Sequence, residues 1–159
     1  MGFVYVDENL QNKMRTVPVG WLSVENAWDF TNYDFNLKKT ANRFQGGTLN
    51  SAGVYALHAA LNFFKHFGFS EIEGTVLSNT AYFIEQLSNA GFEPILMNLP
   101  EQNLAGIVSL KTKNGAKILA HLTEKNIVAA VREDVVRLSP HFYNTKQEID
   151  KVVAELKNY

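Results

Sequence analysis

Residues 43–50, with the sequence RFQGGTLN, place two glycines and a hydroxyl directly ahead of a predicted helix. Gly46 and Gly47 would let the backbone approach a ligand closely. A helix N-terminus offers free N–H groups with partial positive charge, so together with the Thr48 hydroxyl this segment could bind an anion such as phosphate. The alternative is an ordinary loop in which Thr48 or Asn50 caps the helix. The glycine spacing matches neither the P-loop nor the dinucleotide-binding fingerprint.

Residues 135–145, with the sequence VVRLSPHFYNT, place an arginine at the end of a predicted strand, just before a polar turn. The guanidinium of Arg137 is a two-pronged donor that matches a carboxylate, so this segment could bind an acidic group. The alternative is a surface arginine that pairs with Glu133 or Asp134. His141 has no Ser, Cys or Asp partner at a recognisable spacing, which argues against a catalytic triad.

The other histidines and the lack of cysteine restrict the remaining chemistry. His58, His66 and His121 lie in predicted helices, and none of them forms the i, i+4 pair of a zinc-binding helix. The sequence contains no cysteine, so it has neither a disulfide nor a thiolate ligand nor a cysteine nucleophile. We therefore predict no metal site.

Size and charge restrict the class of protein. The 159 residues predict one domain, or one domain with an appendage. The sequence has 46% hydrophobic and 19% charged residues, which is typical of a globular protein. Fifteen basic and sixteen acidic residues leave a formal charge of −1, which argues against nucleic-acid or polybasic membrane binding. No apolar run approaches the ~18 residues of a membrane span, so we expect a soluble, cytoplasmic protein.

The first part of the sequence predicts few regular elements. Residues 2–6 form an apolar, β-rich run that is typical of an interior strand. Residues 7–14 predict a short helix with Leu10 and Met14 facing inward. Residues 15–44 have no clear period and contain several aromatic side chains. Because irregular connections of this length are uncommon, we expect this segment to lie against another part of the protein.

From residue 50 onward the pattern is more regular, and it predicts an α+β fold. Helices are expected from residue 50 to a stop at Gly68, from a capping box at Ser70 and Glu73 to Gly91, at 116–123, and after a capping box at Thr145 and Glu148. Strands are expected at 93–96, 106–110, 127–132 and 135–138, the last two as a hairpin. This order indicates helices packed on one face of a short, mostly antiparallel sheet.

Three segments together resemble the class V, fold-type I aminotransferases, the pyridoxal-phosphate enzymes related to cysteine desulfurases. Residues 43–50, followed by an alanine-rich helix, resemble the segment that joins the two domains of these enzymes. Residues 137–145 resemble the family's C-terminal signature, and residues 2–6 are similar to the strand that follows the cofactor lysine. The resemblance implies the fold of the small C-terminal domain, preceded by a long linking helix.

The same resemblance implies roles for the candidate residues. The counterparts of Gly47 and Thr48 contact the phosphate of pyridoxal 5'-phosphate bound to the neighbouring subunit of a homodimer. The counterpart of Arg137 binds the α-carboxylate of an amino-acid substrate. Both roles agree with the chemistry that the residue types indicate.

Other positions match the family less closely. Arg43, Asn50 and His141 match the family's motifs, but the match alone assigns them no functional role. We expect structural roles for all three, an ion pair in the case of Arg43. Leu49 and Gln45 stand where many relatives have proline and glutamate. These changes are compatible with phosphate binding, and they leave the subfamily open.

The lysine that forms a Schiff base with the cofactor, and the other cofactor contacts of the family's large domain, have no counterpart here. We therefore expect the C-terminal part of a longer enzyme, with residues 1–45 as a remnant of the large domain, 46–68 as the linking helix and 69–159 as the small domain. No catalytic residue is expected in this chain. Transfer, epimerisation and lyase reactions stay open, whereas a desulfurase is disfavoured because cysteine is absent. The alternative is a stand-alone, non-catalytic binding module with the same small-domain fold.

We predict that the purified chain, incubated with pyridoxal phosphate and dialysed, retains no cofactor absorbance band and does not transaminate amino acids. The reason is that no lysine in it has the context of the cofactor lysine, and this amine is needed to hold the cofactor covalently. Absorbance spectroscopy and an amino-acid turnover assay measure this. A retained band, or cofactor-dependent turnover, would contradict the prediction.

Overall fold

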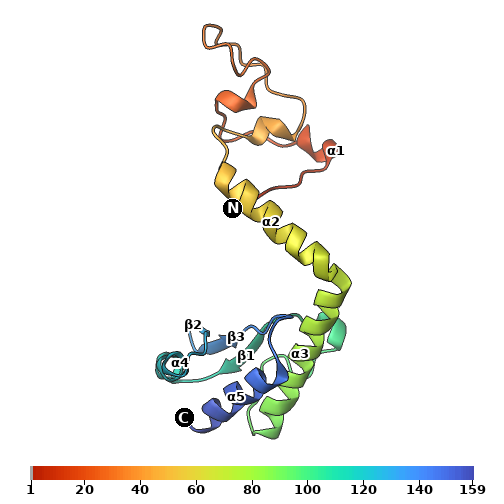
Figure 1. Cartoon of the computed structure of the whole chain (residues 1–159). Coiled ribbons are helices and arrows are strands. Elements are labelled where there is room, and N and C mark those ends of the chain that lie inside the picture. Colours follow the sequence, from red (N-terminus) through yellow and green to blue (C-terminus); the bar gives the residue numbers. More distant parts are fainter. Residues whose placement is uncertain (1) are drawn as a thin grey trace. The chain divides into compact units, whose positions relative to one another are not determined.

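The computed structural model describes residues 2–159, apart from the side chain of Glu101. The chain forms two compact units, a first that ends at Phe63 and a second that covers Phe64–Tyr159. In Figure 1 the first unit consists mainly of loops and short helical turns, and the second contains a small sheet with helices. Helix α2 (Ser51–Phe67) contributes residues to both units.

The first unit has only short regular elements ahead of α2: α1 (Glu8–Gln11) and the 3-10 turns η1 (Trp21–Ser23) and η2 (Ala41–Phe44). The irregular character predicted for residues 15–44 is therefore confirmed. The strand predicted at residues 2–6 is wrong, and Phe3 and Tyr5 are exposed. A strand needs a hydrogen-bonded partner, and no described strand pairs with this segment.

Helix α1 is shorter than the helix predicted over residues 7–14. The expectation that Leu10 and Met14 face inward is wrong, since both are exposed. Gln11 is buried instead, and its side-chain amide donates to the carbonyl of Val6 at 2.9 Å. A local hydrogen bond, rather than an apolar stripe, therefore fixes the buried side of this short helix.

Helices α2 and α3 (Phe69–Asn89) meet at Gly68. This residue has a φ of 87°, a left-handed conformation that costs glycine little, so α2 ends there as predicted. The capping box predicted for Ser70 and Glu73 is wrong, because α3 already begins at Phe69 and its N-cap is Gly68. Helix α2 has no fully buried residue, and near its C-terminal end Phe64 and Phe67 contact the ring of Phe142.

Three strands form the sheet of the second unit: β1 (Val108–Lys111), β2 (Ala130–Arg132) and β3 (Val135–Leu138). Their order is β1-β3-β2, and both pairings are antiparallel. The predicted β2–β3 hairpin is confirmed. The strand predicted at residues 93–96 forms only an isolated bridge between Pro94 and Leu110. Proline has no N–H to continue a ladder, and a turn follows it directly.

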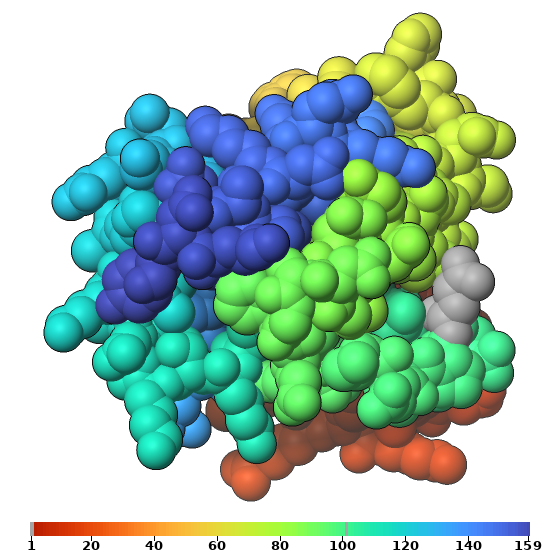
Figure 2. All heavy atoms as spheres, turned by 90° about the horizontal axis from the view of Figure 1, so that it is seen from below, coloured from red at the N-terminus to blue at the C-terminus, as the bar shows by residue number. Residues whose placement is uncertain are grey.

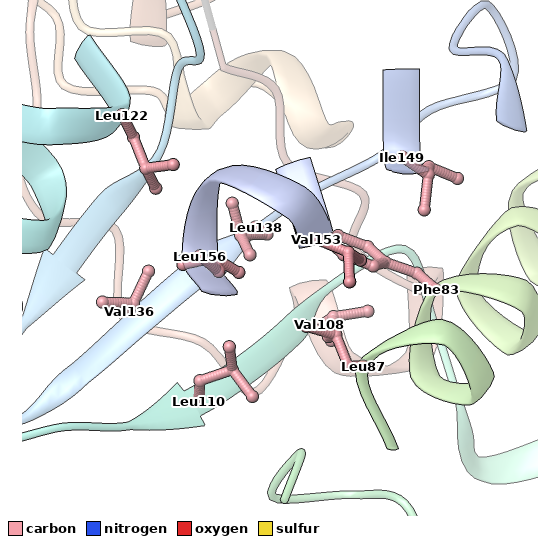
Figure 3. Packing of buried hydrophobic residues seen from close by; sticks show 10 residues of the cluster. All are labelled: Phe83, Leu87, Val108, Leu110, Leu122, Val136, Leu138, Ile149, Val153 and Leu156. Carbon is pink, nitrogen blue, oxygen red and sulfur yellow. The ribbon is translucent and has the colours of Figure 1, made fainter. Parts of the chain in front are cut away.

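Helices α3, α4 (Gly115–Glu124) and α5 (Lys146–Lys157) pack on one face of this sheet. Figure 2 shows α5 lying beside α3, and Figure 3 shows the side chains between the helices and the strands. The core consists of Phe83, Leu87, Val108, Leu110, Leu122, Val136, Leu138, Ile149, Val153 and Leu156. The α+β class and the one-sided helix layer are confirmed. A short 3-10 turn, η3 (Glu101–Asn103), precedes β1.

Asn79 of α3 ties this helix to the loop that follows β3. Its buried amide donates to the carbonyl oxygens of His141 (3.1 Å) and Asn144 (3.0 Å). The Asn144 side chain in turn accepts from the His141 N–H at 2.9 Å. The predicted capping box then begins α5, because Thr145 and Glu148 accept from each other's backbone N–H groups. The Thr145 N–H bond, the larger cause, and the Asn144 amide hold the pKa of the Glu148 carboxyl below its ordinary value.

We predict that Asn79→Ala destabilises the second unit by about 1–3 kcal/mol, because two buried hydrogen bonds are lost. The matched control is Asn89→Ala, since Asn89 lies exposed in the same helix, and it should change stability by less than about 0.5 kcal/mol. Urea unfolding is followed by far-ultraviolet circular dichroism, since Trp21 and Trp28, the two tryptophans, both lie in the first unit. Equal unfolding midpoints for the two variants would count against the role of Asn79.

Candidate functional site

Arg137 lies on the face of the sheet that carries no helix. In β3, Val136 and Leu138 are buried in the core, so Arg137 between them points to the opposite face. Its cross-strand neighbours on that face are Ser109 of β1 and Ala130 of β2. Directly opposed side chains on a sheet stand only about 4.5–5.5 Å apart. Two small neighbours therefore leave space on both sides of the guanidinium.

The guanidinium of Arg137 has no partner within the described part of the chain. The ion pairs found there both involve Glu155 of α5, and no side-chain hydrogen bond reaches Arg137. The alternative in which Arg137 pairs with Glu133 or Asp134 is therefore not realised. Arg137 is half-buried as a residue and has no compensating acid among the described residues. Such a group is available for an external carboxylate.

A cavity of about 600 Å³ lies beside Arg137. Its walls come from the end of β3 and the loop after it, from the first turns of α5, and from residues 126–130. Ser139, Tyr143 and Asn144 line it together with the charged residues Glu148 and Lys151 and with apolar residues such as Phe83. This size and mixed lining are typical of a small-molecule site.

His141 lies in the loop between β3 and α5 within a group of aromatic rings. Its ring stacks on Tyr143, with centroids 5.0 Å apart, and on Phe64, with centroids 6.2 Å apart. The Nδ1 atom is buried and has no hydrogen-bond partner among the described residues. The ring therefore has a packing role, consistent with the structural role expected from the sequence.

The backbone that leads to Gly47 is fixed by η1 of the same unit. A Cβ on Gly20 would lie 1.6 Å from the carbonyl oxygen of Gly46, so only glycine fits at this close approach. The fully buried Ser23 hydroxyl donates to the Gln45 carbonyl at 2.9 Å and accepts from the Gly20 N–H at 3.2 Å. These contacts fix the backbone conformation of Gln45 and Gly46, which precede Gly47.

Thr48 is exposed, and its hydroxyl forms no hydrogen bond with a described residue. Asn50, not Thr48, caps α2, because its side-chain oxygen accepts from the Gly53 N–H at 2.9 Å. A Cβ on Gly46 would meet no described atom within 4 Å beyond its chain neighbours, whereas a Cβ on Gly47 would lie 3.5 Å from the Trp21 Nε1 atom. A glycine backbone beside a hydroxyl that has no described partner fits an anion such as a phosphate group.

The ion pair expected for Arg43 is wrong. No described acidic side chain pairs with it, and its guanidinium carbon instead lies 5.2 Å from the centroid of the Phe44 ring. Its Nε atom is buried and has no hydrogen-bond partner in the described structure. A cation–π contact takes the place of the expected carboxylate.

The predicted site residues fall into two groups. Gly47 and Thr48 are adjacent in the first unit, and Arg137 belongs to the second. Sequence reasoning missed the groups that position them, above all Ser23 and Asn79. The sequence does contain a pattern that indicates a buried role for Asn79. It lies one helical turn before the buried Phe83, on the apolar side of α3.

Neither a metal centre nor a membrane span is found among the described residues. No group of three or more His, Cys, Asp or Glu side chains among them could hold a metal ion. His121 instead contacts Glu155 at 3.0 Å. None of the helices in the described part of the chain is long and apolar enough to cross a membrane.

Comparisons with known sequences give one consistent family. The family model described as Aminotransferase class-V matches residues 1–152. An uncharacterized aminotransferase of Bacillus subtilis, YcbU, is 30% identical over 156 residues, which cover 98% of this chain and 40% of the relative. A probable cysteine desulfurase of Mycoplasma genitalium is 27% identical over an alignment 183 residues long, gaps included. The alignment covers 99% of this chain and 41% of the relative.

Solved structures share the fold. The cystine C-S lyase C-DES matches with a TM-score of 0.83 at 20% identity, over 98% of this chain and 41% of that one. A cysteine desulfurase from Thermococcus onnurineus NA1 matches with the same TM-score and identity, over 97% and 41%. A further structure of C-DES, with glycine linked to its pyridoxal-phosphate cofactor, also has a TM-score of 0.83. The chain thus spans about 40% of the length of these proteins.

The family model covers nearly the whole chain, and the fold agrees with it. The resemblance to class V, fold-type I pyridoxal-phosphate enzymes is thereby confirmed. This chain belongs to the class-V aminotransferase family.

Proposed function

We propose that this chain is the C-terminal part of a pyridoxal-phosphate-dependent enzyme that acts on an amino acid, and that Arg137 binds the α-carboxylate of that substrate. One observation carries the proposal. Arg137 is half-buried and has no ion pair among the described residues, its side chain lies between Ser109 and Ala130 on the helix-free face, and the residue is one of those that line a cavity of about 600 Å³. An arginine without an ion-pair partner among the described residues is available to the carboxylate of a ligand.

We also propose that Gly47 and Thr48 contact the phosphate of the cofactor in the neighbouring subunit of a homodimer. The exposed Thr48 hydroxyl, which has no hydrogen-bond partner among the described residues, and the adjacent glycine backbone support this role. The membership in the family and the cofactor named for one C-DES structure support pyridoxal phosphate as the ligand. A hydroxyl and a backbone N–H are both suitable donors to phosphate oxygens.

The residues of this chain would bind and orient the substrate rather than transfer protons. Pyridoxal phosphate, when bound, supplies an electron sink for bond changes at the α-carbon of the substrate. The parallel N–H donors of the Arg137 guanidinium hold a carboxylate in one plane. The loop that Asn79 holds in place keeps this end of β3 and the cavity wall fixed, so the carboxylate is received in one orientation.

The reaction that we propose is a transfer, an epimerisation or a lyase reaction. Relatives of this chain carry the name cysteine desulfurase, as does one solved neighbour. The present sequence contains no cysteine, so it supplies no thiolate to accept sulfur. Reactions that need no thiol from this part of the enzyme are therefore favoured.

We predict that L-alanine perturbs the amide signals of Ser109, Ala130 and Arg137 in NMR spectra of the 15N-labelled chain. L-alaninamide, which lacks the carboxylate, should not perturb them. Arg137→Gln should weaken alanine binding about tenfold or more, because a charge-assisted hydrogen bond contributes about 1.5–3 kcal/mol.

The control for the loss of one positive charge elsewhere in the chain is Arg15→Gln, which removes an exposed arginine from the first unit. This variant should bind alanine with the wild-type affinity. Equal shifts with alanine and alaninamide would contradict the proposed role of Arg137. Unchanged alanine affinity in the Arg137→Gln variant would contradict it as well.

A further inference from the structure

The helix-free face of the sheet carries two further cations next to Arg137. They are Lys111 and Arg132, here called the Lys111–Arg132 row. Strand alternation places Lys111 of β1 and Arg132 of β2 on this face, since their neighbours Leu110 and Val131 face the helices. The strand register puts both cations opposite Val135, two positions before Arg137. Each is therefore a diagonal neighbour of Arg137 on the adjacent strand. The backbone positions of such diagonal neighbours are about 7–8 Å apart, and their Cβ atoms are somewhat closer.

Neither cation of this row forms an ion pair with a described residue. Lys111 and Arg132 are exposed, and neither forms an ion pair or a side-chain hydrogen bond with a described residue. The other strand positions of this face are serine, alanine and valine. Glu133 and Asp134 lie in the hairpin turn beyond the row, and neither pairs with a described cation.

The concentration of positive charge contrasts with the chain as a whole, whose formal charge is −1. Cations at this spacing repel one another, and the repulsion is relieved when an anion lies between them. A face with charge of one sign also attracts ligands of the opposite sign. Two separated positions, Arg137 and the Lys111–Arg132 row, fit a ligand with two separated negative groups.

We propose that the substrate is an amino acid with an acidic side chain, whose distal acid is bound by Lys111 and Arg132. This inference rests on the proposed function, in which Arg137 takes the α-carboxylate. Lysine and arginine have long, flexible side chains, so both can reach a ligand held at the adjacent row. The charge of the face selects an acidic side chain over a neutral one of the same size.

The experiment compares L-glutamate with L-glutamine, its neutral isostere, by NMR titration of the full chain at low ionic strength. We expect glutamate to bind about 3- to 10-fold more tightly, because two exposed charge contacts each contribute at most about 1 kcal/mol. The Lys111→Gln/Arg132→Gln double variant should reduce this ratio to about one and leave glutamine affinity unchanged. Added salt should lower the wild-type ratio, since the contacts are exposed.

Two variants separate this inference from the proposed function. Arg137→Gln should weaken the binding of both glutamate and glutamine, and it should preserve most of the ratio between the two affinities. Lys117→Gln, an exposed cation on α4 on the other side of the sheet, is the matched control and should change neither affinity.

The outcomes are distinguishable. If Arg137→Gln weakens both ligands but the double variant keeps the wild-type ratio, or if wild-type protein prefers neither ligand, the acidic-substrate inference is overturned and the proposed function stands. If Arg137→Gln changes neither affinity, or if the chain binds neither ligand, the proposed function fails and this inference fails with it.

Discussion

The alternation of side chains along a sheet that is covered on one face only is the constraint on which the candidate site depends. Val108, Leu110, Val136 and Leu138 all point to the helix layer, so the residues between them must point away from it. Arg137 is one of these residues. A shift of β3 by one position would bury the guanidinium in the core and expose Val136, which the packing of α3, α4 and α5 prevents. The core thus determines where the cation stands, and its small neighbours on the strands determine how accessible it is.

Local patterns were enough to predict the elements that depend on local interactions. The α5 capping box, the α4 helix, the β2–β3 hairpin and the end of α2 at Gly68 all agree with the sequence. The errors concern elements that need distant partners or a precise boundary. Residues 2–6 have strand-forming side chains but pair with no described strand, and α3 begins before Ser70 because Gly68 already serves as its N-cap. Single-sequence patterns carry no information on whether a partner strand is present.

The same distinction applies to the site. The residue types of Arg137, Gly47 and Thr48 are enough to indicate anion binding, and the accessibility of these residues in the fold is compatible with it. The groups that position them were not predictable in the same way, because they act over long sequence separations. Asn79 reaches a loop more than sixty residues away, and Ser23 reaches Gln45. The cationic row beside Arg137 also depends on strand register, which the sequence pattern does not determine.

The availability of the Arg137 guanidinium to a carboxylate is the central claim, and chemical modification with phenylglyoxal followed by peptide mapping measures it most directly. Arg43 provides an internal comparison, since its Nε is buried and its guanidinium lies against the Phe44 ring. We expect Arg137 to react faster than Arg43, and an amino acid with a free carboxylate to slow the reaction at Arg137 but not at the exposed Arg15. Reaction of Arg137 no faster than that of Arg43, or at a rate unaffected by the amino acid, would contradict the account.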